Sequence, residues 1–176
     1  FKRHVSLGYN YRMSELCAAV ALAQLERLDE FVAKRRQSAA ALDAVARACR
    51  WLAPQHVPDA CESSYWAYAV RLDAPESDVS WQQFYDKFNE LGGDGFYGAY
   101  LPVPREPVFG MLSEQVQAHP ERYPHYAGCL PDYREVSCPV WEKIQPRVIQ
   151  LKTNYFDLDE AHRQADILAR TIDFFS

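Results

Sequence analysis

Residues 8–16 form the stretch Gly8-Tyr9-Asn10-Tyr11-Arg12-Met13-Ser14-Glu15-Leu16, which leads directly into an alanine-rich segment ending near residue 31. The pattern predicts a turn followed by the start of a long helix. Glycine permits the tight bend, Ser14 is a good N-cap, and the acidic residue after it suits the first helical turn. We therefore expect the fold to be organised around this junction.

The same junction is chemically suited to an anion. The first N–H groups of a helix have no partner inside it, and the helix dipole leaves partial positive charge at that end. Asn10 offers an amide nearby, and Arg12 offers a planar guanidinium that matches a phosphate or a carboxylate. The residues alone also fit a plainer interpretation, in which Asn10 makes a turn and Arg12 pairs with a surface carboxylate.

Composition narrows the class of protein. The chain has 176 residues, of which 48% are hydrophobic, so it is long enough for one globular domain with a substantial core. Its net charge is −5 and its basic residues are scattered, which argues against a nucleic-acid or membrane-surface binder. No apolar run approaches the roughly 20 residues that cross a bilayer. We expect no membrane span.

The cysteines suggest a cellular compartment, and the first residues suggest that the chain is part of a longer protein. Five cysteines are widely spaced and contain no Cys-x-x-Cys pair, a pattern typical of reduced structural thiols in a cytoplasmic protein. The chain opens with Phe1-Lys2-Arg3-His4, without an initiator methionine or a secretory segment. We therefore expect it to be a fragment that begins within a longer protein.

Hydrophobic periodicity predicts an α+β fold, with a long N-terminal helix and a small, largely antiparallel sheet flanked by helices. The expected helix over residues 14–50 is long enough that we predict a kink or a span across a neighbour. The other predicted segments are a loop at 51–64, strands at 65–72, 96–101 and 147–153, a helix capped by Ser80, a short helix near 109–117, helical turns at 138–145, and a terminal helix opened by Asp157 or Asp159. We divide the chain into residues 1–50, with the turn and the linking helix, and residues 51–176, a small α+β domain.

The stretch from Gly8 to Arg36 resembles the DegT/DnrJ/EryC1/StrS sugar aminotransferases, in the segment that follows their cofactor-binding lysine. The matched positions are Gly8, Asn10, Arg12, Met13, Ala18, Ala19, Gln24, Leu25, Arg35 and Arg36. Later segments match in the same order, at Ser64–Leu72, Gly95-Phe96, Tyr100-x-Pro102, Glu106-Pro107-Val108-Phe109 and Cys138-Pro139. The resemblance covers nearly the whole chain.

This resemblance implies the C-terminal portion of a fold-type I enzyme that uses pyridoxal 5'-phosphate (PLP). Its implied activity is transfer of an amino group from glutamate to a keto-sugar carried by a nucleotide, in a homodimer. It implies that Asn10 reaches the cofactor phosphate of the neighbouring subunit, with Arg12 beside it on phosphate or on a substrate carboxylate. Tyr97 and Tyr100 become candidates for the sugar pocket, although they can equally be aromatics packed on the sheet.

Some family features are absent or altered. None of the five lysines lies in the context of the family's lysine, so no catalytic residue is assigned and we predict the chain to be inactive by itself. Ala99 stands where many relatives carry histidine, and Lys152-Thr153 stands where many carry proline. Two alternatives stay open: a PLP-dependent sugar dehydratase or deoxygenase, and a non-catalytic dimerisation or binding module.

Two other motifs indicate no further chemistry. His119, His125 and Cys129 lie in a proline-rich stretch without a fourth matched ligand, which favours ordinary surface residues over a metal site. The run Gly92-Gly93-Asp94-Gly95 lacks the Lys-Ser/Thr that completes a phosphate loop, so we interpret it as a flexible turn. We assign no metal.

Overall fold

The computed structural model describes residues 12–73 and 78–176, which divide into two compact units. The larger unit comprises Met13–Ala99 and Pro146–Ser176, and the smaller comprises residues 100–145 with Arg12. The predicted boundary near residue 50 stays a prediction.

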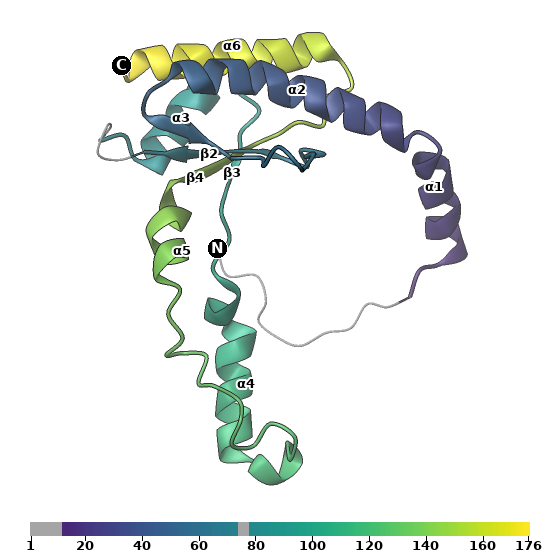
Figure 1. Ribbon diagram of the computed structural model, residues 1–176, viewed down its shortest axis with the longest axis vertical. Coiled ribbons are helices and arrows are strands. Elements are labelled where there is room, and N and C mark those ends of the chain that lie inside the picture. Colours follow the sequence, from purple (N-terminus) through teal and green to yellow (C-terminus); the bar gives the residue numbers. More distant parts are fainter. Residues whose placement is uncertain (1–11, 74–77) are drawn as a thin grey trace. The chain divides into compact units, whose positions relative to one another are not determined.

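The larger unit is built on a four-stranded antiparallel sheet with the strand order β1-β2-β4-β3. Strands β2, β3 and β4 are labelled in Figure 1. Its strands are β1 (Leu52–Pro54), β2 (Tyr68–Leu72), β3 (Tyr97–Gly98) and β4 (Val148–Leu151). At the centre, Val70 lies opposite Ile149. Buried residues alternate along β2 and β4, because successive side chains of a strand point to opposite faces.

Three helices supply the other side of the core: α2 (Leu28–Ala48), α3 (Trp81–Glu90) and α6 (Leu158–Phe174). Helices α2 and α6 lie side by side, and α3 contacts α6 (Figure 1). The most deeply buried side chains come from both layers and include Leu42, Tyr68, Phe84, Phe88, Ile149 and Leu168. This arrangement confirms the predicted α+β fold with an antiparallel sheet flanked by helices.

Local sequence explains where α3 and α6 begin. Ser80 and Gln83 form a capping box, in which the Gln83 N–H donates to the Ser80 hydroxyl at 3.2 Å and the Ser80 N–H donates to the Gln83 side chain at 2.9 Å. Asp157 accepts from the Asp159 N–H at 2.9 Å and caps α6. Both helix starts confirm the predicted caps.

The N-terminal helical region is divided in two. Helix α1 (Glu15–Leu25) ends before α2 begins, and Arg27 between them leaves helical geometry with φ −110° and ψ 11°. The Arg27 guanidinium pairs with Glu30 at 3.1 Å and lies 4.7 Å from the centre of the Phe31 ring. The helical region predicted over residues 14–50 is therefore interrupted, as the predicted kink allowed, and the break falls where a largely apolar sequence gives way to an amphipathic one.

Two strand predictions also need correction. Strand β1 lies inside the segment predicted as a loop, and it pairs Leu52 with Leu72. A three-residue strand ending in a proline shows no alternation to detect, and proline is tolerated because β1 is an edge strand. The strand predicted over residues 96–101 is reduced to β3, which has two residues.

The smaller unit is mostly helical. It contains the 3₁₀ turns Val103–Arg105 and Pro120–Arg122 and the helices α4 (Pro107–Ala118) and α5 (Pro139–Ile144). Proline opens both α-helices, as suits a residue without an N–H. Helix α4 is longer than the predicted 109–117 because Pro107 already occupies its first turn. None of the helices described in either unit combines the length and apolarity needed to cross a bilayer.

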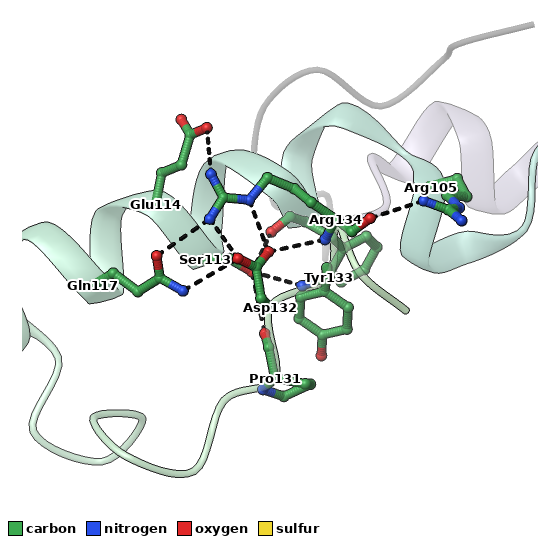
Figure 2. Close-up of polar contacts among 9 residues, drawn as sticks. Arg105, Ser113, Glu114, Gln117, Pro131, Asp132, Tyr133 and Arg134 are labelled. Carbon is green, nitrogen blue, oxygen red and sulfur yellow. Dashed lines mark hydrogen bonds and ion pairs between the residues drawn. The ribbon is translucent and has the colours of Figure 1, made fainter. Parts of the chain in front are cut away.

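A polar network around Arg134 holds the returning chain against α4 (Figure 2). Its guanidinium donates to Asp132 at 2.7 Å, to Glu114 at 3.1 Å and to Gln117 at 3.2 Å. The backbone N–H of Arg134 also donates to Asp132 at 3.0 Å. Arg134 holds the pKa of the Asp132 carboxyl well below its usual range. This charge-assisted cluster fixes the segment that follows Pro131.

A buried serine makes the second attachment in the same region (Figure 2). The Ser113 hydroxyl on α4 accepts from the Tyr133 N–H at 3.1 Å and lies 3.2 Å from the Pro131 carbonyl oxygen. From the other side, Arg105 donates to the Arg134 carbonyl at 2.9 Å and pairs with Glu142 at 3.2 Å. These contacts join three segments of the smaller unit that are distant in sequence.

A steric prediction concerns Gly93, just after α3. A Cβ added there would lie 2.2 Å from ring atoms of Phe88 and 2.7 Å from its carbonyl oxygen. Because Phe88 is in the core, Gly93→Ala should lower the free energy of unfolding by about 1–3 kcal/mol. Gly98→Ala is the matched control, since its Cβ would come no closer than 3.6 Å to Trp81, and it should cost under about 1 kcal/mol. Equal denaturation midpoints for the two variants would contradict this account.

The Asp132 cluster should make the smaller unit sensitive to acid. A carboxyl whose folded pKa is depressed adds stability above its unfolded pKa, and that stability is lost as the pH falls through the folded pKa. Hydrogen-exchange protection at Tyr133 and Arg134, corrected for intrinsic rates, should therefore fall below about pH 4. Asp132→Asn should show low protection at pH 7 already and little further loss on acidification.

Glu121→Gln serves as the control, because Glu121 is an exposed carboxylate whose ion pairs among the described residues are with its sequence neighbours His119 and Arg122. In this variant, hydrogen-exchange protection at Tyr133 and Arg134 should equal that of the parent protein at every pH. The expectation fails if the parent keeps its protection at low pH or if the two variants behave alike.

Candidate functional site

The first candidate site lies at the start of α1. Ser14 caps the helix, and its hydroxyl accepts from the Cys17 N–H at 3.2 Å. Arg12 is exposed two residues before the cap. Asn10, the other residue predicted to hold phosphate, lies outside the described residues. The chain therefore presents one exposed guanidinium just ahead of a capped helix end.

These groups suit a phosphate, with one opposing feature. The guanidinium and the positive end of an 11-residue helix both favour an anion. Glu15 in the first turn adds a negative charge that partly offsets this field. A phosphate would need the further donor that Asn10 offers in sequence. In sequence, Asn10, Arg12 and the α1 cap offer donors suited to a phosphate and no group for covalent chemistry, and their role in binding a cofactor stays a prediction.

The second candidate site surrounds Tyr97, one of the two aromatics predicted to line a substrate pocket. Tyr97 lies on the edge strand β3, and its side chain is 55% exposed. It borders a cavity of about 160 Å³, whose lining residues are Arg35, Trp66, Ala67, Tyr97, Gln150, Leu151, Lys152 and Asn154. Tyr97 is thus a pocket residue in the larger unit, with two cations and two amides around the same space.

One wall of this cavity is fixed by buried hydrogen bonds. The Thr153 hydroxyl is fully buried and lies 2.5 Å from the Tyr65 carbonyl oxygen and 3.3 Å from that of Trp66. Arg35 on α2 donates to the Trp66 carbonyl at 3.0 Å and to Thr153 at 3.2 Å. Tyr65 adopts a left-handed conformation, with φ 49°, that bulky residues rarely accept. The surrounding bonds hold the backbone in place on either side of Trp66.

A larger cavity lies next to this wall. Its volume is about 540 Å³, and it shares Arg35, Trp66 and Asn154 with the smaller cavity. Its remaining lining is largely apolar and includes Leu28, Phe31, Val32, Tyr155 and Phe156. The larger volume falls within the roughly 300–1,000 Å³ of typical ligand pockets, and the smaller volume alone does not.

Tyr100, the other predicted pocket residue, belongs to the smaller unit. Its carbonyl accepts from the Trp141 indole N–H at 3.2 Å, which attaches the start of that unit to α5. Its side chain is partly exposed. Tyr97 and Tyr100 therefore fall in different units, and the substrate role of both stays a prediction.

Two phenols in the larger unit have perturbed acidity. Burial raises the pKa of Tyr68 well above its usual value, and its hydroxyl donates to Asp43 at 2.8 Å. Burial, with Asp94 nearby, likewise raises the pKa of Tyr155 beside the larger cavity. Both phenols therefore hold their protons more tightly than an exposed tyrosine does. No group of three or more potential metal ligands gathers in the part of the chain that the structure describes.

Sequence reasoning missed Trp66, Arg35 and Lys152 as neighbours in one pocket. They come from a loop, a helix and the end of β4, so no local spacing connects them. One signal was present: Lys152-Thr153 departs from the proline that the family resemblance led us to expect, and both residues contribute to this pocket or its wall.

Comparisons with known proteins match the chain along most of its length. Residues 1–150 match the DegT/DnrJ/EryC1/StrS aminotransferase family. The GDP-perosamine synthase of Escherichia coli O157:H7 is 31% identical over 119 residues, which cover 66% of this chain and 30% of that protein. The GDP-perosamine synthase of Caulobacter vibrioides is 39% identical over 67 residues, covering 38% of this chain and 18% of that protein.

Solved structures agree on the fold. Helicobacter pylori PseC, an aminotransferase involved in the biosynthesis of pseudoaminic acid, superposes with a TM-score of 0.68 at 17% identity, over 97% of this chain and 40% of its own. The synthase of 3-amino-5-hydroxybenzoic acid superposes with a TM-score of 0.65 at 23% identity. The match covers 94% of this chain and 40% of the chain of that enzyme. The chain thus spans less than a third of the curated relatives it matches, and it belongs to the DegT/DnrJ/EryC1/StrS aminotransferase family.

Proposed function

We propose that this chain forms part of a PLP-dependent enzyme that transfers an amino group from glutamate to the keto group of a nucleotide-linked sugar. The observation that carries the proposal is the family match over residues 1–150. The curated relatives are named GDP-perosamine synthases, which supports a sugar carried by a nucleoside diphosphate. All five cysteines are free thiols, which fits a cytoplasmic enzyme.

The proposed contribution of this chain to the cofactor is to hold its phosphate. When bound, PLP supplies the electron-withdrawing ring through which an amino group passes between two carbonyl compounds. Asn10 would donate its amide to the phosphate and Arg12 its guanidinium, at the positive end of α1. In this proposal the two residues orient the cofactor, and neither transfers a proton.

The proposal places the reactive lysine on polypeptide other than this chain. Three of its lysines already have structural contacts: Lys34 pairs with Glu30 at 3.3 Å, Lys87 with Glu90 at 3.0 Å, and Lys152 donates to the Asp94 carbonyl at 2.7 Å. None stands in the family's lysine context. By itself, the chain is proposed to be inactive.

The proposed assembly is a homodimer in which α1 is covered. No residue of α1 is buried in the chain, although the helix is almost entirely apolar. Leu16 is 81% exposed and Val20 is 63% exposed. Alanines between them allow a neighbouring helix to approach closely. A helix that is apolar all round is normally buried, so this surface is suited to a second subunit.

The phosphate role predicts a selective loss of cofactor affinity. In the enzyme assembled with its lysine-bearing polypeptide, Asn10→Ala and Arg12→Gln should each weaken PLP binding about tenfold or more, since each removes a hydrogen bond to a charged group. Binding of pyridoxal, which lacks the phosphate, should be little changed. Spectroscopic titration with the two compounds makes this comparison.

Arg122→Gln, which removes an exposed arginine of the smaller unit, is the matched control and should bind PLP as the parent does. Parental PLP affinity in Asn10→Ala would remove the basis for the phosphate role. The chain alone, mixed with PLP, should leave the cofactor with its free absorption spectrum. Detectable amino transfer by the chain alone would refute its proposed inactivity.

The dimer proposal predicts that charge on α1 separates the subunits. Val20→Glu should shift the protein from dimer to monomer in sedimentation equilibrium, because the carboxylate would be buried without a partner. Val140→Glu, at a 74% exposed valine of α5, should leave the dimer intact. A monomeric parent, or a Val20→Glu protein that stays dimeric at the same concentration, would rule out α1 as the interface.

A further inference from the structure

The cavity beside Tyr97 is lined by two cations, and no carboxylate is among the described residues that line it. Arg35 has no carboxylate within ion-pair distance among residues 12–73 and 78–176, and its recorded bonds go to a carbonyl and a hydroxyl. Lys152 donates to the Asp94 carbonyl at 2.7 Å, while the Asp94 carboxylate is 3.9 Å away. Two cations therefore line the space with only one distant counter-charge, an arrangement suited to a multiply charged anion.

An aromatic surface adjoins the cations. The Trp66 side chain is 68% exposed although its backbone carbonyl is fixed by Arg35 and Thr153. A rigid loop thus presents a large apolar ring to solvent, where burial by a ligand would be favourable. Since indole faces stack well on planar heterocycles, Trp66 is suited to a nucleobase.

Amide groups complete the pocket. Gln150 donates to the Gly98 carbonyl at 3.0 Å, which fixes its side chain and leaves its own oxygen as an acceptor. Asn154 lines both the small and the large cavity. Amides of this kind can bond to the polar edge of a base or to sugar hydroxyls.

The geometry points to a nucleoside diphosphate site in the pocket formed by Arg35, Trp66 and Lys152. Phosphate oxygens accept from Arg35 and Lys152 in the small cavity, and the base stacks on Trp66 where this cavity meets the larger one. This inference rests on the proposed function, because it places the nucleotide half of the sugar substrate. Hydrogen bonds within the chain fix the wall of the pocket, so the site is preorganised.

Calorimetry of the protein with GDP, pyrophosphate and guanosine tests the site. Trp66→Ala should weaken GDP about tenfold or more, and Trp66→Phe should restore most of that affinity because stacking is retained. Lys152→Gln should weaken the binding of GDP and of pyrophosphate and reduce the salt dependence of GDP binding. The affinity for guanosine should be unchanged. Circular dichroism and melting temperature should show that each variant is folded.

Two exposed residues of the smaller unit provide matched controls. Tyr126→Ala removes an aromatic that is 50% exposed, and Arg122→Gln removes an exposed cation. Both should bind GDP as the parent does. The inference is overturned if the parent does not bind GDP, if Trp66→Ala and Lys152→Gln bind it with parental affinity, or if pyrophosphate binds as tightly as GDP regardless of residue 66.

Amino transfer in the assembled enzyme separates this inference from the proposed function. If Trp66→Ala leaves the KM for the nucleotide-linked sugar unchanged while transfer proceeds, the pocket assignment fails and the function stands. If GDP binding depends on Trp66 and Lys152 but the parent enzyme transfers no amino group from glutamate, the pocket stands and the proposed function fails.

Discussion

The antiparallel pairing of β2 with β4 is the constraint on which the larger unit depends. It joins segments far apart in the chain and places Val70 opposite Ile149, both deep in the core. A slip of one residue would turn these side chains to the other face, so helix packing fixes the register. The same register decides where the chain after β4 arrives. Thr153, two residues beyond the strand, therefore meets the carbonyls of Tyr65 and Trp66 just before β2.

Helix α1, unlike the sheet, is not held by packing within the chain. Its residues are good helix formers and Ser14 caps it, but it has only 11 residues and no buried side chain. Isolated helices of that length are marginal in water, because tertiary packing normally supplies most of their stability. Family membership and the proposed dimer give this helix a place to be covered. The positive helix end that would hold a phosphate is therefore stable only to the extent that its apolar sides are packed.

Local sequence predicted the elements whose cause is local. The capping box at Ser80, the cap at Asp157 and the prolines that open α4 and α5 are contained within a few residues. Strand β1 was missed because its pairing with β2, rather than its own pattern, makes it a strand. For the site, family resemblance supplied Tyr97 as a candidate, and the structure places it on a cavity. Trp66 and Lys152 could not be grouped with it from sequence, since only the sheet and α2 bring them together.

The chemistry of Arg35 and Lys152 explains how the pocket proposed for an anion can have a rigid wall and still offer free N–H donors. A left-handed Tyr65 costs on the order of 1 kcal/mol or more, so it persists only where neighbouring bonds over-determine it. Arg35 supplies some of those bonds through a single nitrogen. A guanidinium carries five N–H donors in a fixed plane, so it can fix the wall and still present donors to an anion. A lysine at position 35 would have a single nitrogen for both tasks. At position 152, where one bond to the Asp94 carbonyl suffices, the ammonium group keeps two further N–H donors for a ligand.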